Sequence, residues 1–305
     1  FLVPVFRKRL LMAKLQNVTR AHLGLLLANL VWAVNYPFYK VLMPHYITPV
    51  ALATFAVTVA GLLGLVSLFW GGIEKIDRND IYKFIGAALL MGIAKKLLLM
   101  IGMQHTSPIE ASIIATLGPI LVLVFSFFFG IDRFTPMKVF GMVLGMGGAL
   151  LVILSGGGAV TSGEKLMGNL FVVGAIAASS FSMVWLKGLI MKYRPITVLR
   201  VYYPMAAVML LPFGFDSMIH TDFAAIPPHI WWVIAYAVLL PSFGPNYLLI
   251  FSLHYVKPTI SSVYFYLQPV IATGLSVALG MDKLSWDRGL ASIAVFVGVL
   301  LVVNA

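Results

Sequence analysis

Apolar runs of about 20 residues recur along the whole chain, and Gly, Pro or charged residues separate them. A transmembrane helix needs about this length to cross a hydrocarbon core of about 30 Å. Strands of a membrane β-barrel are about ten residues long and strictly alternating, and the runs here are longer and do not alternate. We therefore expect an all-α, polytopic membrane protein with ten transmembrane helices. The ten runs lie at residues 21–41, 50–70, 81–104, 106–129, 137–154, 168–191, 196–214, 229–251, 257–280 and 286–304.

The composition agrees with this pattern. Of the 305 residues, 61% are hydrophobic and 10% are charged, and the mean hydropathy is +1.00, far from the values of a soluble globular domain. The net charge of +11 could indicate nucleic-acid binding, but most Lys and Arg residues stand singly between apolar runs. We interpret them as a topology signal and expect no nucleic-acid partner. The chain has no cysteine, so disulfides and thiolate metal sites are excluded.

The distribution of Lys and Arg predicts the orientation. With both termini in the cytoplasm, the N-terminal tail and the loops on that side carry fifteen Lys and Arg residues, and the opposite loops carry four. Residues 1–20 form a basic lead-in that contributes five of the fifteen. Arg200, near the start of the seventh run, is either a topology charge or a binding residue. We expect a multi-pass protein of the cytoplasmic (inner) membrane with both termini cytoplasmic.

The two halves of the chain match each other at one offset. Residues 107–135 align without a gap on residues 257–285, an offset of 150 residues (107 to 257). The matching pairs are Pro108 and Pro258, Ser112 and Ser262, Pro119 and Pro269, Gly130 and Gly280, Asp132 and Asp282, Arg133 and Lys283, and Gly148 and Gly298. Each copy holds five helices. Because five is an odd number, the second copy enters the membrane from the opposite side, so the two copies are inverted, as in many secondary transporters. We expect a first repeat at 21–154, a linker at 155–167 and a second repeat at 168–305.

Several features of these repeats are similar to one known family. They are Trp32, Asn35 and Lys40 in the first run, Arg200 in the seventh, Pro119 and Pro269 in the fourth and ninth, and the endings FFFGIDRFTPMKVFGMVLGMGGALLVI and VALGMDKLSWDRGLASIAVFVGVLLVV. Over residues 21–304 the chain resembles the EamA-type branch of the drug/metabolite transporter superfamily. The resemblance implies a ten-helix inverted-repeat fold with cytoplasmic termini that moves small metabolites, such as amino acids, by alternating access.

The chain also departs from that family pattern in two places. ALATFAV stands where the first repeat would have an Arg-aromatic pair, and Asp132 and Asp282 stand where Glu is usual. The superfamily also includes sugar-phosphate exchangers and small multidrug exporters, so the resemblance does not specify a substrate.

Lys95 and Lys96 stand side by side near the middle of the third run, in GIAKKLLLMIG. A lysine at the membrane centre costs about 2.5–3.5 kcal/mol on insertion scales, so two of them need a polar environment or a partner. The nearby acid is Glu110, which we place about 7 Å from Lys96 along the helix axis. Neighbouring residues point about 100° apart, so at most one lysine faces a cavity squarely. We expect a substrate or gating role for at least one; the alternative is a structural pair with Glu110 or with freed carbonyls.

Other polar and aromatic residues at mid-depth are further candidates. Ser112 and Thr116 share a helical face with Pro119. A proline in a spanning helix frees a backbone carbonyl and is tolerated where that carbonyl faces a cavity, so we expect this face to line the cavity. The alternative is that the two hydroxyls simply permit close helix packing. Tyr264 and Gln268 lie on a stripe that is polar in the second copy alone. The candidate substrate-binding residues are Lys95, Lys96, Asn35, Tyr36, Ser112, Thr116, Ser182, Trp185, Arg200, Asn246, Tyr247, Ser262, Tyr264, Tyr266 and Gln268.

These features favour a secondary transporter of an amino acid or another carboxylate-bearing or anionic solute, working by alternating access. The alternative is a multidrug or lipophilic-cation exporter. That chemistry needs a membrane-buried acid, and the first, second, third, sixth, eighth and ninth runs have none. No motif of a metalloprotease or serine hydrolase occurs, so we expect no enzymatic activity, cofactor or metal. We expect a monomer whose partners are a small-molecule substrate, the lipid bilayer and a coupling ion, either a proton or a counter-substrate.

Overall fold

The computed structural model describes residues 2–72, 74–131, 133, 135–154, 162–281 and 286–304, and all regular structure within them is helical. Asp132, Asp282 and residues 155–161 of the predicted linker lie outside the described residues. The elements are α1 (Leu2–Leu42), α2 (Pro49–Val66), η1 (Ser67–Trp70), η2 (Arg78–Asp80), α3 (Ile81–Ala87), η3 (Ala88–Ala94), α4 (Lys95–His105), α5 (Pro108–Ala115), α6 (Gly118–Phe128), α7 (Pro136–Leu154), α8 (Ser162–Trp185), α9 (Lys187–Lys192), α10 (Pro195–Ile219), η4 (Phe223–Ala225), α11 (Pro228–Leu239), α12 (Gly244–Leu253), α13 (Pro258–Val263), η5 (Tyr264–Tyr266), α14 (Leu267–Ala278) and α15 (Trp286–Asn304).

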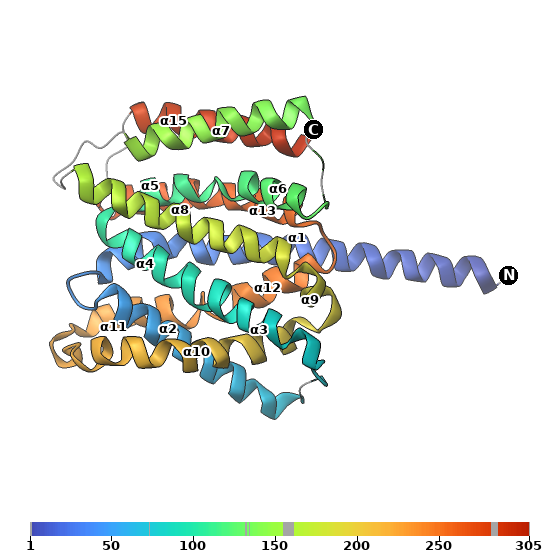
Figure 1. Cartoon of the computed structure of the whole chain (residues 1–305), viewed down its shortest axis with the longest axis horizontal. Coiled ribbons are helices and arrows are strands. Elements are labelled where there is room, and N and C mark those ends of the chain that lie inside the picture. Colours follow the sequence, from blue (N-terminus) through green and yellow to red (C-terminus); the bar gives the residue numbers. More distant parts are fainter. Residues whose placement is uncertain are drawn as a thin grey trace.

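Eight segments of the described chain are long and apolar enough to cross a membrane, and they coincide with eight of the ten predicted runs. The other two runs are α7 and α15, each 19 residues long, which pack along each other at one side of the bundle (Figure 1). The first part of α1 extends beyond the bundle (Figure 1). The prediction of an all-helical, multi-pass membrane protein is confirmed over these residues.

Glycine residues let pairs of helices approach closely. A Cβ atom on Gly102 of α4 would lie 2.7 Å from the backbone oxygen of Gly168 in α8. A Cβ atom on Gly298 of α15 would lie 2.4 Å from the backbone nitrogen of Gly145 in α7. Lipid tails are as apolar as the side chains, so membrane helices associate through such close packing of small residues. The main pairs are α2 with α10, α4 with α8, α1 with α12 and with α14, and α7 with α15.

The third and eighth spans are interrupted at equivalent positions. In the third span, α3 is followed by the π-helical segment η3, and α4 begins at Lys95. In the eighth span, α11 ends at Leu239 and α12 begins at Gly244. The offset of 150 residues places 88–94 on 238–244 (88 to 238, 94 to 244), so the interruptions coincide. Pro241 and Pro245 lack N–H donors and account for the break in the eighth span.

The fourth and ninth spans are interrupted next to their prolines. α5 ends at Ala115 and α6 begins at Gly118, directly before Pro119. In the ninth span, the 3-10 segment η5 separates α13 from α14, and Pro269 follows in the first turn of α14. A proline inside a helix removes one backbone donor and crowds the preceding turn, so the regular ladder stops there.

Candidate functional site

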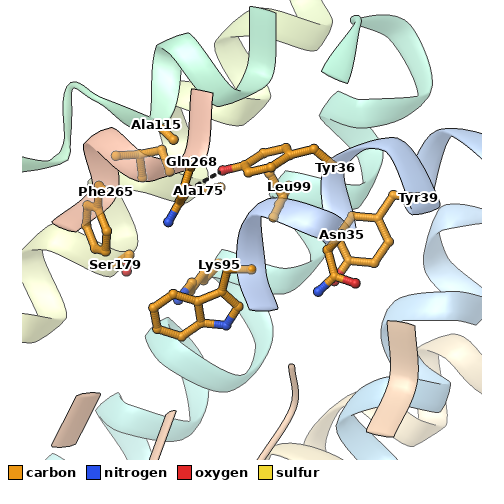
Figure 2. Close-up of a pocket in the computed structure, with 12 residues that line it drawn as sticks. Asn35, Tyr36, Tyr39, Lys95, Leu99, Ala115, Ala175, Ser179, Phe265 and Gln268 are labelled. Atoms are coloured by element: carbon orange, nitrogen blue, oxygen red, sulfur yellow. Dashed lines mark hydrogen bonds between the residues drawn. The ribbon is translucent and has the colours of Figure 1, made fainter. Parts of the chain in front are cut away.

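Two small cavities lie inside the bundle and adjoin at Lys95 and Trp32, which line both. The first cavity has a volume of about 60 Å³ and includes Asn35 and Gln268 in its wall (Figure 2). The second cavity has a volume of about 50 Å³ and includes Lys96 and Asn246. All four interrupted spans contribute to the walls, through Ala115 and Phe265 in the first cavity and Gly92 and Ser242 in the second. The interruptions therefore surround one central region.

The two ammonium groups are held by aromatic residues of α1. Lys95 Nζ lies 4.5 Å from the centroid of the Trp32 ring. Lys96 Nζ donates a hydrogen bond of 3.2 Å to the Tyr39 hydroxyl and lies 5.7 Å from the centroid of that ring. Such cation–π contacts contribute about 0.5–1 kcal/mol when exposed and about 2 kcal/mol when desolvated. Neither lysine forms an ion pair with any part of the chain that the structure describes.

Glu110 is not the partner of the lysines, so the alternative of a structural pair between Glu110 and Lys96 is wrong. Glu110 Oε1 lies 2.8 Å from Nζ of Lys165, in α8. Glu110 lines neither cavity. Lys95 and Lys96 thus form a pair of adjacent cations that face neutral walls.

The polar groups of the first cavity include an amide network between α1 and α14. The Tyr36 hydroxyl donates to Gln268 Oε1 at 2.9 Å (Figure 2), and Gln268 Nε2 donates to Asn29 Oδ1 at 2.7 Å. Asn35 is only 3% exposed, and its Oδ1 atom has no hydrogen-bond partner among the described residues. The first cavity therefore combines one ammonium group, that of Lys95, with the Asn35 amide oxygen and the hydrogen-bonded pair of Tyr36 and Gln268, in a wall that is otherwise mostly apolar.

The polar groups of the second cavity come from the break in the eighth span. Asn246 Nδ2 donates to the carbonyl oxygens of Pro241 at 3.1 Å and Ser242 at 2.9 Å. The Tyr203 hydroxyl, from α10, also donates to the Ser242 carbonyl. Side chains thus satisfy the carbonyls that the missing helical turn leaves open, which makes a non-helical segment tolerable inside a membrane.

Four predicted hydroxyl residues lie outside both cavities. Each donates to the backbone carbonyl three residues before it in its own helix, at 2.5–2.9 Å. All four are fully buried or nearly so. They are Ser112, Thr116, Ser182 and Ser262. In this conformation these hydroxyls are used for local bonds within packed helices, not for the cavity walls.

Four predicted aromatic residues also lie outside both cavities. Trp185 stacks on Phe181 with ring centroids 5.8 Å apart. The Tyr264 hydroxyl lies 2.7 Å from His22 Nδ1. Tyr266 packs on a ring of α15, and Tyr247 packs on Phe251. Asn35, Tyr36, Lys95, Lys96, Asn246 and Gln268 are the predicted residues that the structure brings to the cavities.

Arg200 closes the end of the second span and does not reach the central cavities. Its guanidinium donates to the carbonyl oxygens of Gly71 at 2.5 Å and Gly72 at 2.9 Å, to the Ser67 carbonyl, and to the Ser67 hydroxyl at 2.8 Å. A helix end leaves carbonyl groups without intrahelical donors, and Arg200 supplies them. With Tyr247 it also borders a wider recess of about 600 Å³ at that end of the bundle.

Charged side chains join the start of the third span to the loop before α10. Asp80 Oδ2 lies 2.5 Å from Lys192 Nζ and accepts from the Tyr193 hydroxyl at 2.9 Å, and Asp77 Oδ2 lies 3.2 Å from Lys192. The backbone N–H of Asn79 and the ammonium of Lys192 hold the pKa of Asp77 below its usual value. Hydrogen bonding to Asp80 raises the pKa of Lys192. This cluster ties the two halves together at the end from which α1 projects.

Several wall residues were not among the predicted binding residues, among them the aromatic residues Tyr39, Tyr203 and Phe265. Tyr39 follows Trp32 and Tyr36 at helical spacing, so an aromatic stripe along one face of the first span could have indicated it. Tyr203 and Phe265 carry no such signal, because their positions depend on how α10 and η5 pack.

Comparisons with known proteins agree with this architecture. A model of the EamA-like transporter family matches residues 19–154 and again residues 166–304. An uncharacterized transporter of Archaeoglobus fulgidus is 25% identical over 174 residues, which span 57% of this chain and 60% of that protein. A second one from this organism is 21% identical over 286 residues, 93% of this chain and 97% of that protein. The uncharacterized transporter YoaV of Bacillus subtilis is 24% identical over 264 residues, 84% and 87% of the two chains.

A crystal structure of another protein has the same fold. It superposes with a TM-score of 0.65 at 18% sequence identity and covers 92% of this chain and 97% of its own. The family model fits each half of the chain once, which agrees with an internal duplication. These matches, which together span nearly the whole sequence, show that the chain belongs to the EamA-like transporter family.

Proposed function

We propose that this chain is a secondary transporter that carries a small carboxylate-bearing or otherwise anionic solute, amino acids included, across the cytoplasmic membrane. The ammonium groups of Lys95 and Lys96 bind the anionic group of the solute. Two inverted five-helix repeats alternate access to this site from the two sides of the membrane, and both termini are cytoplasmic.

One observation carries the proposal: two adjacent lysines inside a membrane-spanning segment line cavities whose described walls contain no acid. Buried charges are normally paired, since an isolated charge in a low-dielectric site is strongly unfavourable. Here the aromatic rings of Trp32 and Tyr39 compensate the lysines only in part. An anionic solute would supply the missing negative charge at this site.

The pairing of helices supports the inverted repeat. In an inverted repeat, the third span corresponds to the eighth and the sixth span to the first. The contact between α4 and α8 should therefore have a counterpart between α12 and α1, and both contacts are present. The pairs α2 with α10 and α7 with α15 exchange with themselves. Such an arrangement is expected when a pseudo-two-fold axis runs through the centre of the bundle, where substrates of inverted-repeat transporters bind.

The size of the cavities supports alternating access. Pockets that hold small molecules usually enclose about 300–1,000 Å³, and the cavities beside Lys95 enclose about 60 Å³ and about 50 Å³. Neither cavity in this conformation is large enough to hold a small solute. Solute binding requires the walls to separate, which is the motion that alternating access supplies.

A lipophilic-cation exporter fits the cavities less well. Such a transporter needs an acid that binds cation and proton in turn. The walls carry two cations, and Glu110, a buried acid of the fourth span, is held by Lys165 outside them. Aromatic walls alone attract cations, but the ammonium of Lys95 already occupies the face of Trp32.

A thermal-shift screen of the purified chain tests the proposal. The panel contains amino acids, organic acids, sugar phosphates and lipophilic cations. A ligand at about 100 times its Kd stabilises the folded state by about 2.7 kcal/mol. We expect one or more anionic or carboxylate-bearing solutes to raise the Tm of the wild type, and to raise it much less in Lys95→Met.

Lys83→Met is the matched control, because Lys83 lies in the same span but outside both cavities. It should keep the ligand response, and counterflow of the same solute in proteoliposomes should follow the thermal shifts. Stabilisation of the wild type and Lys95→Met by lipophilic cations alone would contradict the proposal and favour the exporter.

A further inference from the structure

A recess of about 600 Å³ lies at the end of the bundle from which α1 projects (Figure 1). Its wall comes from the end of the second span at Trp70, the start of the seventh span at Pro195, and α12 in the second half of the eighth span. The recess is therefore level with the points where three spans end, which is where lipid headgroups begin. Its volume is that of a small-molecule pocket, unlike the volumes of the two central cavities.

Two arginines give the wall of this recess its positive charge. Arg194 directly precedes α10 and is exposed, and its guanidinium forms no hydrogen bond or ion pair with any residue that the structure describes. Arg200 has five N–H groups, and its four hydrogen bonds go to the end of the second span. One N–H of Arg200 therefore stays without an acceptor. Arg194 keeps all of its guanidinium donors open.

The first turn of α10 adds a backbone donor to the two arginines. Pro195 has no N–H, and the N–H groups of Thr197 and Val198 donate to the Arg194 carbonyl. The N–H of Ile196, a wall residue, lies in a first turn where no intrahelical acceptor precedes it. This end of the helix dipole also favours a negative charge.

No acid balances this positive charge within the described wall of the recess. Glu74 accepts from the backbone N–H of Arg194 at 2.9 Å but does not line the recess. A second recess at the same end, of about 700 Å³, is different, because Asp77 lies in its wall and pairs there with Lys192. An anionic group bound beside Arg194 would supply the charge that the wall lacks.

An aromatic stripe leads from this basic edge toward the middle of the eighth span. Tyr247, Phe251 and Tyr255 follow one another at intervals of four residues, and the centroids of successive rings lie 6.4 Å and 5.0 Å apart. Tyr247 is 37% exposed and Tyr255 is 39% exposed. Eight residues of helix rise by about 12 Å. The stripe is an apolar surface on which an acyl chain can lie, and a free phosphate ion would leave it unused.

We propose that the recess binds the phosphate group of an anionic phospholipid, with Arg194 and the first turn of α10 on the phosphate and an acyl chain along the stripe of Tyr247, Phe251 and Tyr255. Basic pockets between spans bind anionic lipid headgroups, and aromatic residues such as Trp70 are typical of the membrane interface. In the orientation proposed above, this lipid belongs to the cytoplasmic leaflet. The site is separate from Lys95, so the inference does not depend on the transported solute.

Native mass spectrometry of the full chain, delipidated in detergent, tests the site. The probes are dioleoyl phosphatidylglycerol, dioleoyl phosphatidylcholine, which has the same chains, and glycerol 3-phosphate, which has none. The wild type should retain the anionic lipid more than the zwitterionic lipid. One arginine near the membrane surface corresponds to about fivefold in anionic-lipid binding, so Arg194→Gln should retain phosphatidylglycerol about fivefold less.

Arg78→Gln is the matched control, because Arg78 is exposed at the same end of the bundle but lines the second recess. It should retain phosphatidylglycerol as the wild type does. Arg194→Gln keeps the backbone contact with Glu74, and an unchanged Tm without lipid would confirm that it is folded. Equal retention of the two lipids by the wild type, or of phosphatidylglycerol by Arg194→Gln and the wild type, would overturn the proposal. Displacement of the lipid by an equal concentration of glycerol 3-phosphate would also overturn it and assign the recess to a soluble phosphate.

Fluorescence quenching in phosphatidylcholine nanodiscs locates the lipid. The chain has six tryptophans, so the emission of Trp70 is obtained as the difference between the wild type and Trp70→Phe. A small share of brominated phosphatidylglycerol should quench this emission more than the same share of brominated phosphatidylcholine, and Arg194→Gln should remove the excess. Equal quenching by the two lipids in the wild type would contradict the proposal. Neither experiment contains a transported solute, so a failure of the Lys95 site leaves both readouts intact.

Discussion

In the third span, Lys95 and Lys96 directly follow the π-helical segment, and in the eighth span Pro245 and Asn246 stand at the equivalent positions (95 to 245, 96 to 246). In the eighth span, the carbonyls at the interruption have a hydrogen-bond donor in the same span, because the Asn246 amide donates to two of them. The third presents two cations whose partners are neutral. The third and eighth spans are therefore similar in their backbone breaks and different in their chemistry.

Under the proposed function, this difference would let a bundle of two similar halves bind an asymmetric solute. One wall of the central region is positive, and the facing wall is a neutral segment of backbone and amide groups. A solute with one anionic end fits this arrangement in one orientation. The asymmetry also predicts that changes in the third span affect transport, whereas changes in the eighth span affect stability first.

The largest effect is expected from Lys95→Met. Hydrogen bonds to charged groups contribute about 1.5–3 kcal/mol, so loss of the ammonium should slow counterflow of the anionic solute about 10- to 150-fold. Lys95→Arg should retain part of the rate, because the charge remains while the geometry changes. Counterflow rates in proteoliposomes, with Lys83→Met as control, measure this. Equal rates in Lys95→Met and the wild type would show that the Lys95 ammonium does not bind the transported solute.

The next effect is expected from Asn246→Leu, in the eighth span. The Pro241 and Ser242 carbonyls would each lose the Asn246 amide and keep one other donor, Trp32 Nε1 and the Tyr203 hydroxyl respectively, and the loss of two hydrogen bonds costs about 1–3 kcal/mol of unfolding free energy. Tyr247→Leu, at the next and exposed position, should be close to neutral. Thermal unfolding in detergent compares the two variants. If Asn246→Leu leaves the Tm unchanged, the break does not depend on its amide.

A smaller effect is expected from Lys96→Met, because Lys96 lines only the second cavity and already has Tyr39 as a partner. Counterflow should fall about fivefold, which corresponds to about 1 kcal/mol. Tyr39→Phe keeps the ring and removes the hydroxyl. A double-mutant cycle of Lys96→Met and Tyr39→Phe should give a non-zero coupling energy, since the two side chains are in contact. Additive effects would argue against that contact.

The smallest effect is expected from Lys192→Met at the charged start of the third span. The eighth span begins with Pro228, His229 and Ile230 and has no such cluster. The Asn79 N–H first, and Lys192 second, lower the pKa of Asp77, so these contacts stabilise the fold above the ordinary Asp pKa, and this stability is lost as pH falls through the lowered value. The wild type should thus melt slightly above Lys192→Met at neutral pH and converge with it in acid. Parallel curves at all pH values would refute this linkage.

The sequence indicates much of the fold because length and hydropathy decide where a helix can cross a membrane. Pro119, Pro241 and Pro269 lie at three of the interruptions, but α1 and α10 continue through Pro37, Pro204 and Pro212, so a proline alone does not specify a break. The π-helical segment is different: ALLMGIA contains no proline, and nothing in it marks a π turn.

The site was less accessible to sequence analysis, because it depends on how helices rotate and pack. Lys95 and Asn35 could be selected as polar groups at mid-depth. Glu110 could not be assigned to Lys165, because 165 lies in a segment that the hydropathy pattern treats as a linker. The local carbonyl bonds of residues such as Ser112 were equally invisible, since a hydroxyl in a helix can face a neighbour, a cavity or its own backbone.

The most direct test of the central claim is a structure of the full chain with the anionic solute that stabilises it most in the thermal-shift screen. We predict its anionic group within hydrogen-bonding distance of Nζ of Lys95 or Lys96, between the interruptions of the third and eighth spans. A solute bound elsewhere, with Lys95 still on the Trp32 ring and Lys96 still on the Tyr39 hydroxyl, would contradict the account.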